Sequence, residues 1–153
     1  MTPAIDALRA ARVEFRIHSY TVAGDDWAQD AAQALALAPE RVFKTLLAAV
    51  GSELVVALVP ANATLALKAL ASAAGGKRAL MADPERAERS SGYLRGGISP
   101  FGQRRQLRTF ADRSIGDHDS VFLSAGRRGL EVELAPDEVI RVCEAQLAAL
   151  ARF

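Results

Sequence analysis

A glycine-rich loop followed by two arginines is the segment of this chain best suited to holding a substrate. Residues 96–105 read GGISPFGQRR. Glycines allow the main chain to approach a ligand closely because they carry no Cβ, and Pro100 fixes its own φ angle and keeps Ser99 extended, so the loop is stiff. The guanidinium groups of Arg104 and Arg105 match the geometry of phosphate. The segment predicts a site for the reacting end of a phosphorylated or nucleotide-linked substrate.

Polar residues on several expected strands are candidates for the same site, and each has a plain structural alternative. Lys44 lies within an otherwise apolar strand, where it either holds a phosphate or polar group in a pocket or points outward from a half-solvated sheet. Ser124 closes a strand and is either a site hydroxyl or a turn serine. Tyr20 also ends a strand and is either a site phenol or a packing residue with a wet tip. Glu131 and Glu133 alternate with apolar residues, which without a site would make them solvent-facing carboxylates.

The familiar catalytic motifs do not account for this chain. His18 and His118, the two histidines, fit neither a catalytic triad nor a metal-ligand spacing and are expected at the surface. Cys143 falls on the apolar face of the last expected helix and is expected in the core. Residues 97–102 have the glycine spacing of a phosphate-binding loop, but Gln103 and Arg104 replace its lysine and hydroxyl residue. We therefore expect no metal and no cofactor, and small-nucleotide phosphohydrolysis is only a third interpretation.

Size, composition and charge distribution limit the classes of protein to which this chain can belong. A chain of 153 residues, half of them hydrophobic and 24% charged, suits one domain spanning residues 1–153. The absence of a long apolar run and of a signal peptide, together with a single cysteine, predicts a cytoplasmic protein without membrane contact. The net charge is +1, yet residues 95–128 carry seven arginines against three aspartates. This asymmetry either steers an anion to one face or reflects solvated arginines.

The elements that must position these residues alternate between helices and strands. Gly51-Ser52 separates two apolar runs and predicts a tight hairpin turn. Val139, Cys143, Leu147 and Leu150 recur at helical spacing and predict one core-facing helix. The mixture of hairpins and helices predicts an α+β fold. We expect helices at about 2–12, 27–37, 64–74, 84–91 and from 136 onward, and strands at about 14–20, 42–50, 53–60, 77–81, 107–111, 121–124 and 130–134.

Six short motifs occur in the order and spacing of one family. They are MTPA at 1–4, FKTLL at 43–47, MADP at 81–84, RSSGYL at 89–94, GGISP at 96–100 and GRRGL at 126–130. With this set the chain resembles the bacterial Cys-tRNA(Pro)/Cys-tRNA(Cys) deacylases of the YbaK/EbsC family, free-standing relatives of the prolyl-tRNA synthetase editing domain. The resemblance implies a single α+β domain with a curved mixed β-sheet of about six to seven strands surrounded by helices.

The resemblance also implies an activity: removal of cysteine misattached to tRNA(Pro), a hydrolase or lyase reaction at the aminoacyl ester. In this family the thiol of the substrate is thought to attack its own ester carbonyl, and tRNA(Pro) charged with cysteine and prolyl-tRNA synthetase are the implied partners. Two alternatives stay open, an Ala-tRNA(Pro)-type deacylase of the same superfamily and a non-catalytic tRNA- or synthetase-binding module.

The family pattern assigns roles to individual residues. Glu131 stands where the family usually has aspartate, Phe43 where it has tyrosine, and Arg104-Arg105 where it has paired lysines. The residues that the resemblance places in catalysis are Lys44, Gly96, Gly97 and Ser99. Those that it places around the substrate are Tyr20, Thr45, Ile98, Pro100, Ser124 and Glu131. Those that it places on tRNA phosphates are Arg104, Arg105, Arg127 and Arg128.

Overall fold

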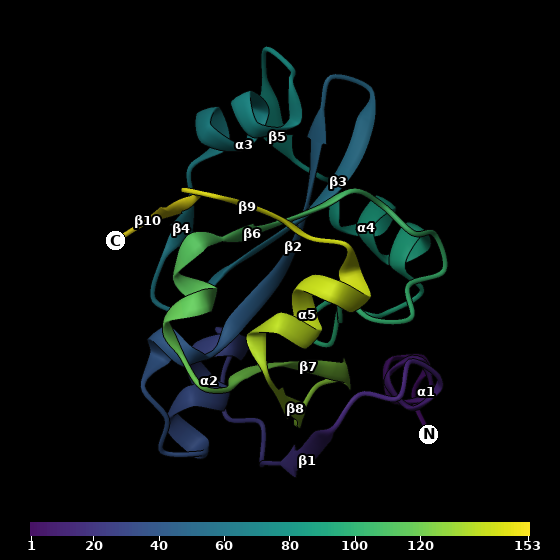
Figure 1. Ribbon diagram of the computed structural model, residues 1–153, viewed down its shortest axis with the longest axis vertical. Helices are drawn as coiled ribbons and strands as arrows, with labels where there is room; N and C mark the ends of the chain where they lie inside the picture. Colours follow the sequence, from purple (N-terminus) through teal and green to yellow (C-terminus); the bar gives the residue numbers. More distant parts are fainter.

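The computed structural model describes residues 1–153, which form five α-helices, ten strands and two short 3-10 helices (Figure 1). None of the helices has the length and apolar character required to cross a membrane. The helices are α1 (Pro3–Ala10), α2 (Trp27–Ala34), α3 (Leu67–Ala74), α4 (Pro84–Ser91) and α5 (Pro136–Cys143), with the 3-10 helices η1 (Pro39–Arg41) and η2 (Arg113–Asp117). The strands are β1 (Phe15–Ser19), β2 (Phe43–Val50), β3 (Glu53–Pro60), β4 (Thr64–Leu65), β5 (Ala79–Met81), β6 (Thr109–Asp112), β7 (Val121–Arg127), β8 (Leu130–Leu134), β9 (Gln146–Ala148) and β10 (Ala151–Arg152).

The expected hairpin forms the centre of the larger sheet. Strands β2 and β3 pair antiparallel over their full length, and Gly51 at their turn has a φ of 61°, in the left-handed region that glycine adopts most easily. The sheet order is β5-β2-β3-β6-β9, with β3, β6 and β9 mutually parallel. The sheet is therefore mixed, and the α+β prediction is confirmed.

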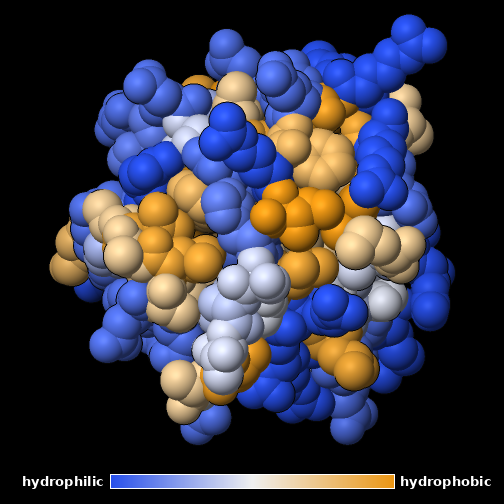
Figure 2. All heavy atoms as spheres, turned by 90° about the horizontal axis from the view of Figure 1, so that it is seen from below, coloured by the Kyte–Doolittle hydropathy of each residue, from blue (hydrophilic) through white to orange (hydrophobic).

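A second, three-stranded sheet of order β1-β8-β7 lies at the lower end of the molecule in Figure 1. A single parallel bridge between Val42 and Phe122 lies between this sheet and the start of β2 in the larger sheet. Strand β1 is an edge strand and leaves Ile17 38% exposed. The end of the molecule seen from below shows hydrophobic groups set among hydrophilic side chains (Figure 2).

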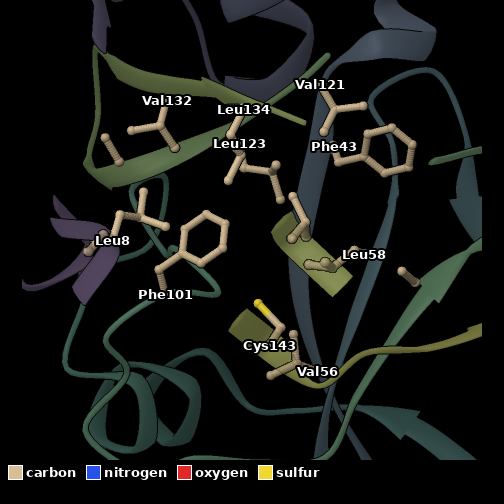
Figure 3. Packing of buried hydrophobic residues seen from close by; sticks show 14 of the residues in the cluster. Leu8, Phe43, Val56, Leu58, Phe101, Val121, Leu123, Val132, Leu134 and Cys143 are labelled. Atoms are coloured by element: carbon tan, nitrogen blue, oxygen red, sulfur yellow. The ribbon is translucent and has the colours of Figure 1, made fainter. Parts of the chain in front are cut away.

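The main hydrophobic core fills the space between these two sheets, α1 and α5 (Figure 3). Phe43 of β2, Leu58 of β3 and Leu123 of β7 are among its fully buried side chains. Phe101, which follows the glycine-rich loop, is also buried in this core, and the Tyr93 hydroxyl donates a hydrogen bond of 2.5 Å to its carbonyl oxygen. The loop is thus fixed to the core at its C-terminal side.

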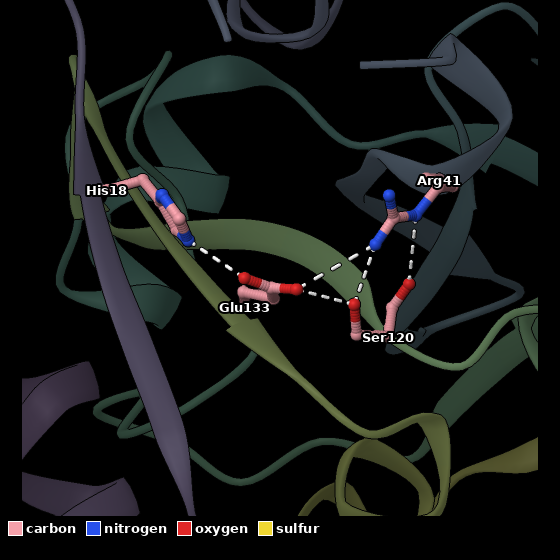
Figure 4. A network of polar contacts seen from close by, with 4 residues as sticks. All are labelled: His18, Arg41, Ser120 and Glu133. Atoms are coloured by element: carbon pink, nitrogen blue, oxygen red, sulfur yellow. Dashed lines mark hydrogen bonds and ion pairs between the residues drawn. The ribbon is translucent and has the colours of Figure 1, made fainter. Parts of the chain in front are cut away.

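A polar network ties β1 and β8 to η1 (Figure 4). His18 Nε2 lies 2.9 Å from Glu133 Oε1, and the Ser120 hydroxyl donates to Glu133 Oε2 at 2.6 Å. Arg41 donates to the Ser120 hydroxyl at 2.7 Å and stacks over the ring of Phe122. The carboxylate lies between the serine and the imidazole, so the network lacks the serine–imidazole hydrogen bond of a catalytic triad. We assign it a structural role.

The prediction of one long C-terminal helix was wrong. Helix α5 ends at Cys143, where Glu144 adopts a φ of 49°. Leu147 lies instead in β9 and is 43% exposed, and Leu150 is buried after β9 with its amide bonded to Asp112 Oδ1. Pairing with β6 therefore overrides the helical spacing of these leucines.

Two further boundaries differ from the expectation. Thr64–Leu65 is a short strand paired with β10, so the helix begins only at Leu67. Strand β7 extends to Arg127 through a bulge after Ser124, so two residues and not five connect it to β8. The short strands β4, β9 and β10 were not expected, since runs of two or three residues carry no recognisable alternation.

Candidate active site

A cavity of about 530 Å³ opens between β2, the start of α2, the glycine-rich loop and the paired strands β7 and β8. Its size is within the range of about 300–1,000 Å³ typical of small-molecule sites. Apolar walls are supplied by residues such as Phe43, Leu47 and Ala87. The predicted site residues that line it are Tyr20, Lys44, Thr45, Gly96, Ile98, Ser124 and Glu131.

Two residues of the glycine-rich loop line this cavity with main-chain amides that have no partner in the protein. The Gly97 amide donates to the carbonyl oxygen of Leu94 at 3.0 Å, which turns the chain. The amides of Gly96 and Ile98, on either side of it, donate to no group of the protein. Both residues line the cavity. Two unpaired N–H donors at a cavity wall can stabilise an oxyanion.

Packing against the protein itself explains why this loop needs its glycines. A Cβ at Gly97 would lie 2.6 Å from Arg127 Cα, closer than real Cβ contacts come. A Cβ at Gly96 would lie 2.8 Å from the Trp27 ring and 2.9 Å from Arg128 Cγ, and its φ is 88°. The paired glycines therefore let the loop pack closely against the β7–β8 turn, whereas the sequence had suggested close approach to a ligand.

Lys44 supplies a half-buried ammonium on the cavity wall. It projects from β2 and forms none of the ion pairs of the chain. Desolvation by burial lowers its pKa, and the nearby Asp26 carboxylate opposes that shift. A desolvated cation without an ion-pair partner attracts an anionic or polar ligand group strongly.

Glu131 lies at the back of the cavity and is only 6% exposed, so the solvent-facing alternative is wrong for this residue. It faces Ser124 across the β7–β8 pair and His18 across the β8–β1 pair. Burial raises the pKa of Glu131 to about 8. At neutral pH its carboxyl group therefore mostly holds a proton and can both donate and accept a hydrogen bond.

Three hydroxyl groups complete the polar wall. The Ser124 oxygen accepts from the Gly126 amide at 3.1 Å, so this serine both supports the turn and faces the cavity. Burial, and then the Glu131 carboxyl, raise the pKa of Tyr20, which keeps its phenol protonated. The Thr45 hydroxyl is buried without a hydrogen-bond partner. These groups can align a ligand that carries several polar atoms.

The sequence reasoning missed the residues on the α2 side of the cavity and at its rim. Trp27 lines the cavity, its indole N–H is buried without a partner, and the Arg128 guanidinium stacks 5.1 Å from its ring centroid. Asp26, the N-cap of α2, also lines the cavity, as does Arg95, which pairs with Glu88 at 3.3 Å. The single tryptophan of the chain was the one signal that could have pointed to this wall.

The remaining predicted site residues do not line the cavity. Ser99 is fully buried, and its hydroxyl oxygen accepts from the Phe101 amide at 3.3 Å. Pro100 lines a separate cavity of about 200 Å³. The main chain of Arg104 and Arg105 bonds to the C-terminal end of α4. Arg127 ends β7 and Arg128 follows it in the turn to β8, both packed against Gly96 and Gly97. Ser99 and Pro100 thus shape the loop from within.

The cysteine and the histidines lie outside the cavity. Cys143 is buried with its sulfur 3.8 Å from the Pro100 carbonyl oxygen, and burial raises the pKa of its thiol to about 12. His18 belongs to the polar network, and His118 packs edge-on against Phe43. Both histidines are half-buried, and not fully at the surface as expected. No cluster of three acidic, histidine or cysteine side chains that could hold a metal occurs in the chain.

The sequence of the chain is similar to that of a known protein family and of one of its named members. Residues 23–142 match the family model of the aminoacyl-tRNA editing domain. EbsC of Enterococcus faecalis, named as a Cys-tRNA(Pro)/Cys-tRNA(Cys) deacylase, is 37% identical over 125 residues, which cover 80% of this chain and 76% of EbsC. Identity at this level over most of both chains shows that the two proteins are homologous.

Solved structures show the same fold at lower identity. A structure described as a trans-editing enzyme for prolyl tRNA synthetase superposes with a TM-score of 0.85 and 22% identity, covering 99% of this chain and 96% of that one. A scaffold used for grafting linear epitopes superposes with a TM-score of 0.88 and 21% identity over the same shares. The chain belongs to the aminoacyl-tRNA editing domain family, and within it to the YbaK/EbsC deacylases, enzymes that act on the aminoacyl ester of tRNA.

Proposed function

We propose that this enzyme removes cysteine from Cys-tRNA(Pro), with the aminoacyl-adenosine end of the tRNA bound in the cavity beside Gly96 and Lys44. The observation that carries the proposal is the pair of unpaired amides, of Gly96 and Ile98, on the wall of a cavity that also holds the unpaired ammonium of Lys44. Such donors match the charge that develops on the carbonyl oxygen of an ester under attack. The whole chain, residues 1–153, acts as the single editing domain in this proposal.

The nucleophile in this proposal is the thiol of the substrate. Its sulfur attacks the ester carbonyl carbon, the bond from that carbon to the ribose oxygen breaks, and the thiol proton passes to the ribose oxygen. The products are a cyclic thioester and tRNA with a free terminal hydroxyl, so the step consumes no water. The position of Cys143 in the core, with its pKa raised to about 12, supports a nucleophile from the substrate.

The cavity residues then serve to orient the substrate and to stabilise charge. Holding the thiol and the ester carbon in attack geometry lowers the barrier by several kcal/mol, and each oxyanion donor contributes about 3 kcal/mol. We assign the oxyanion to the Gly96 and Ile98 amides, and a phosphate or ribose contact to Lys44. Tyr20, Ser124 and the protonated Glu131 hold the aminoacyl group.

A substrate panel tests this proposal. Purified protein is incubated with tRNA(Pro) charged with cysteine, alanine or serine, and the release of each amino acid is measured. We expect rapid loss of cysteine and slow loss of serine, because serine replaces the attacking sulfur with a hydroxyl. Release of alanine in preference to cysteine would assign the Ala-tRNA(Pro) activity, and equal rates for cysteine and serine would exclude self-attack by the thiol.

A lysine variant tests whether the cavity acts as an active site, as expected for an enzyme and not for a binding module that has no activity. Lys44→Ala removes the cavity ammonium, and Lys68→Ala, on the exposed surface of α3, is the matched control. We expect kcat/KM for Cys-tRNA(Pro) to fall at least about tenfold in the first variant and to stay unchanged in the second, since a charge-assisted hydrogen bond contributes about 1.5–3 kcal/mol. Equal kcat/KM values for the two variants would show that Lys44 has no role in the site.

Prolyl-tRNA synthetase is the partner that we propose for selection of the tRNA. Contacts to phosphates carry little sequence information, so the protein alone has few means of telling one tRNA from another. We expect the purified enzyme to deacylate Cys-tRNA(Pro) and Cys-tRNA(Cys) at similar rates, and added synthetase to favour Cys-tRNA(Pro). A strong preference without synthetase would contradict the need for this partner.

A further inference from the structure

A second concave surface lies on the other side of α4 and has no role in the proposed chemistry. It encloses about 670 Å³ between α4, the β2–β3 turn and the segment 105–108. We call it the basic groove. Its charged and hydroxyl-bearing walls include Glu53, Arg86, Arg89, Ser90, Arg105 and Arg108.

Three of the four arginines of the basic groove are without a partner. Arg108 is held by Glu53 through two hydrogen bonds of 2.8 and 2.9 Å. Arg86, Arg89 and Arg105 are exposed and take part in none of the ion pairs of the chain. Three guanidinium groups therefore face one groove with their charge uncompensated, an arrangement suited to several phosphates.

The arginines stand on a fixed backbone. The Arg104 and Arg105 amides donate to the Ser91 and Ser90 carbonyl oxygens at 2.9 and 3.1 Å, which ties this segment to the end of α4. The Arg108 carbonyl accepts from the Val56 amide at 2.9 Å, which ties it to β3. The Ser90 hydroxyl is buried at the groove wall without a hydrogen-bond partner. Preformed positions reduce the ordering cost of binding a ligand here.

Helix α4 separates the basic groove from the substrate cavity. Ala87 lines the cavity, while its neighbours Arg86, Arg89 and Ser90 line the groove. An α-helix with its side chains is about 10–12 Å wide, and a nucleic acid strand carries one phosphate per roughly 3.4 Å of rise. A strand whose 3′ end is bound in the cavity can therefore reach the groove within a few nucleotides.

We propose that the basic groove binds the sugar–phosphate backbone of the tRNA acceptor arm while the charged 3′ end occupies the cavity. The inference rests on the proposed function for the position of the 3′ end. It moves the main phosphate contacts from Arg104, Arg127 and Arg128, which lie outside the groove, to Arg86, Arg89 and Arg105. Because a backbone contact ignores base identity, the groove adds affinity without selecting a particular tRNA.

A double variant tests the groove. Arg86→Gln with Arg89→Gln removes two exposed charges from α4, and Lys77→Gln with Arg78→Gln removes two exposed charges from the connection between α3 and β5. Both variants are compared with the unaltered protein for folding by circular dichroism. The affinity for uncharged tRNA is then measured over a range of salt concentrations, and cleavage is measured on Cys-tRNA(Pro) and on cysteinyl-adenosine, which has no acceptor arm.

We expect the groove variant to bind tRNA at least about tenfold more weakly than the control, with a salt dependence that is less steep by roughly 0.7–0.9 for each phosphate that the variant no longer neutralises. Its rate on cysteinyl-adenosine should match that of the unaltered protein. Equal tRNA affinity and salt dependence in both double variants would overturn the proposal. Loss of the effect of added synthetase alone, with tRNA affinity intact, would also overturn it and assign the groove to an acidic protein surface.

The uncharged-tRNA measurement keeps the two proposals apart. If the unaltered protein failed to release cysteine from any tRNA, the proposed function would fall, while the binding comparison would still decide whether the groove holds RNA. If cysteine were released and the groove variant bound tRNA as well as its control, only the inference about the groove would be overturned.

Discussion

Replacing Glu131 with glutamine should change how the stability of the protein depends on pH. Glu131 is buried at the back of the cavity, and burial raises the pKa of its carboxyl group from 4.5 to about 8. Between these two values the unfolded chain loses the proton and the folded protein keeps it. Stability therefore falls as pH rises from about 4.5 to about 8. Glutamine has a similar size and no charge, so Glu131→Gln removes this dependence.

The size of the effect follows from the pKa shift, since each pKa unit corresponds to about 1.4 kcal/mol. Because the carboxyl group ionises more readily in the unfolded chain, its raised pKa in the folded protein costs roughly 3 kcal/mol of folding free energy at pH 7 and about 5 kcal/mol above pH 8. Between pH 5 and pH 8.5 the free energy of unfolding of the wild-type protein should fall by about 4 kcal/mol relative to that of Glu131→Gln. At pH 5 the two proteins should differ little from this cause.

Urea titrations at pH 5, 7 and 8.5, at one salt concentration, measure this difference. Glu85→Gln, on the exposed surface of α4, controls for the removal of one carboxyl group. If the wild type and Glu131→Gln kept the same difference in unfolding free energy at all three pH values, Glu131 would not be a buried protonated acid. Its proposed role as a hydrogen-bond donor to the aminoacyl group would then be refuted as well.

Three further substitutions test the packing and hydrogen-bond contacts around the cavity. Gly97→Ala, whose Cβ would lie 2.6 Å from the Cα of Arg127 at the end of β7, should lower the free energy of unfolding by roughly 1–3 kcal/mol in urea titrations and remove most of the deacylation rate. Gly116→Ala, with open space around its Cβ, should change neither quantity. Tyr93→Phe removes a buried hydrogen bond to Phe101 and should cost about 1–3 kcal/mol of unfolding free energy, and an unchanged midpoint would show that the loop is held without it. Glu133→Ala removes the central carboxylate of the network in Figure 4 and should lower the thermal midpoint with little change in kcat/KM, while a large loss of activity at unchanged stability would place the network in the site.

The sequence predicted most of the secondary structure because local signals were strong. The Gly51-Ser52 turn and the prolines that begin α1, α4 and α5 mark boundaries that hold in the structure. The leucines at 147 and 150 led to a wrong prediction, because Leu147 lies in a strand that pairs in parallel with β6 and Leu150 follows that strand. Parallel pairing between distant segments leaves no mark in a local pattern.

The composition of the candidate site was predicted only in part. Tyr20, Lys44 and Ser124 carried polar groups at strand positions, and the structure brings them to one cavity. Glu131 looked like a surface carboxylate by alternation, but it is buried at the back of a cavity that residues of the glycine-rich loop and of α2 also line. Trp27 reached the cavity wall through the same tertiary packing, which a one-dimensional pattern does not contain.

The short motifs of the chain meet in space around the glycine-rich loop, and this explains why they occur together. The Thr2 hydroxyl, in the first motif, donates to the Ala125 carbonyl oxygen at 2.6 Å, just before the last motif begins. A Cβ at Gly126 would lie 2.9 Å from the Tyr93 ring, and one at Gly102 would overlap the Pro3 carbonyl oxygen.

These close contacts pack the segments that flank the loop against the N-terminus and the end of β7. Because Gly97 also rests on the Arg127 main chain, the position of the Gly96 and Ile98 amides depends on these packing contacts. Donors that are fixed before the substrate arrives need no reorganisation when charge develops on the ester oxygen. In the proposed mechanism, the motifs at the N-terminus and around the β7–β8 turn therefore act on catalysis through the position of two backbone N–H groups.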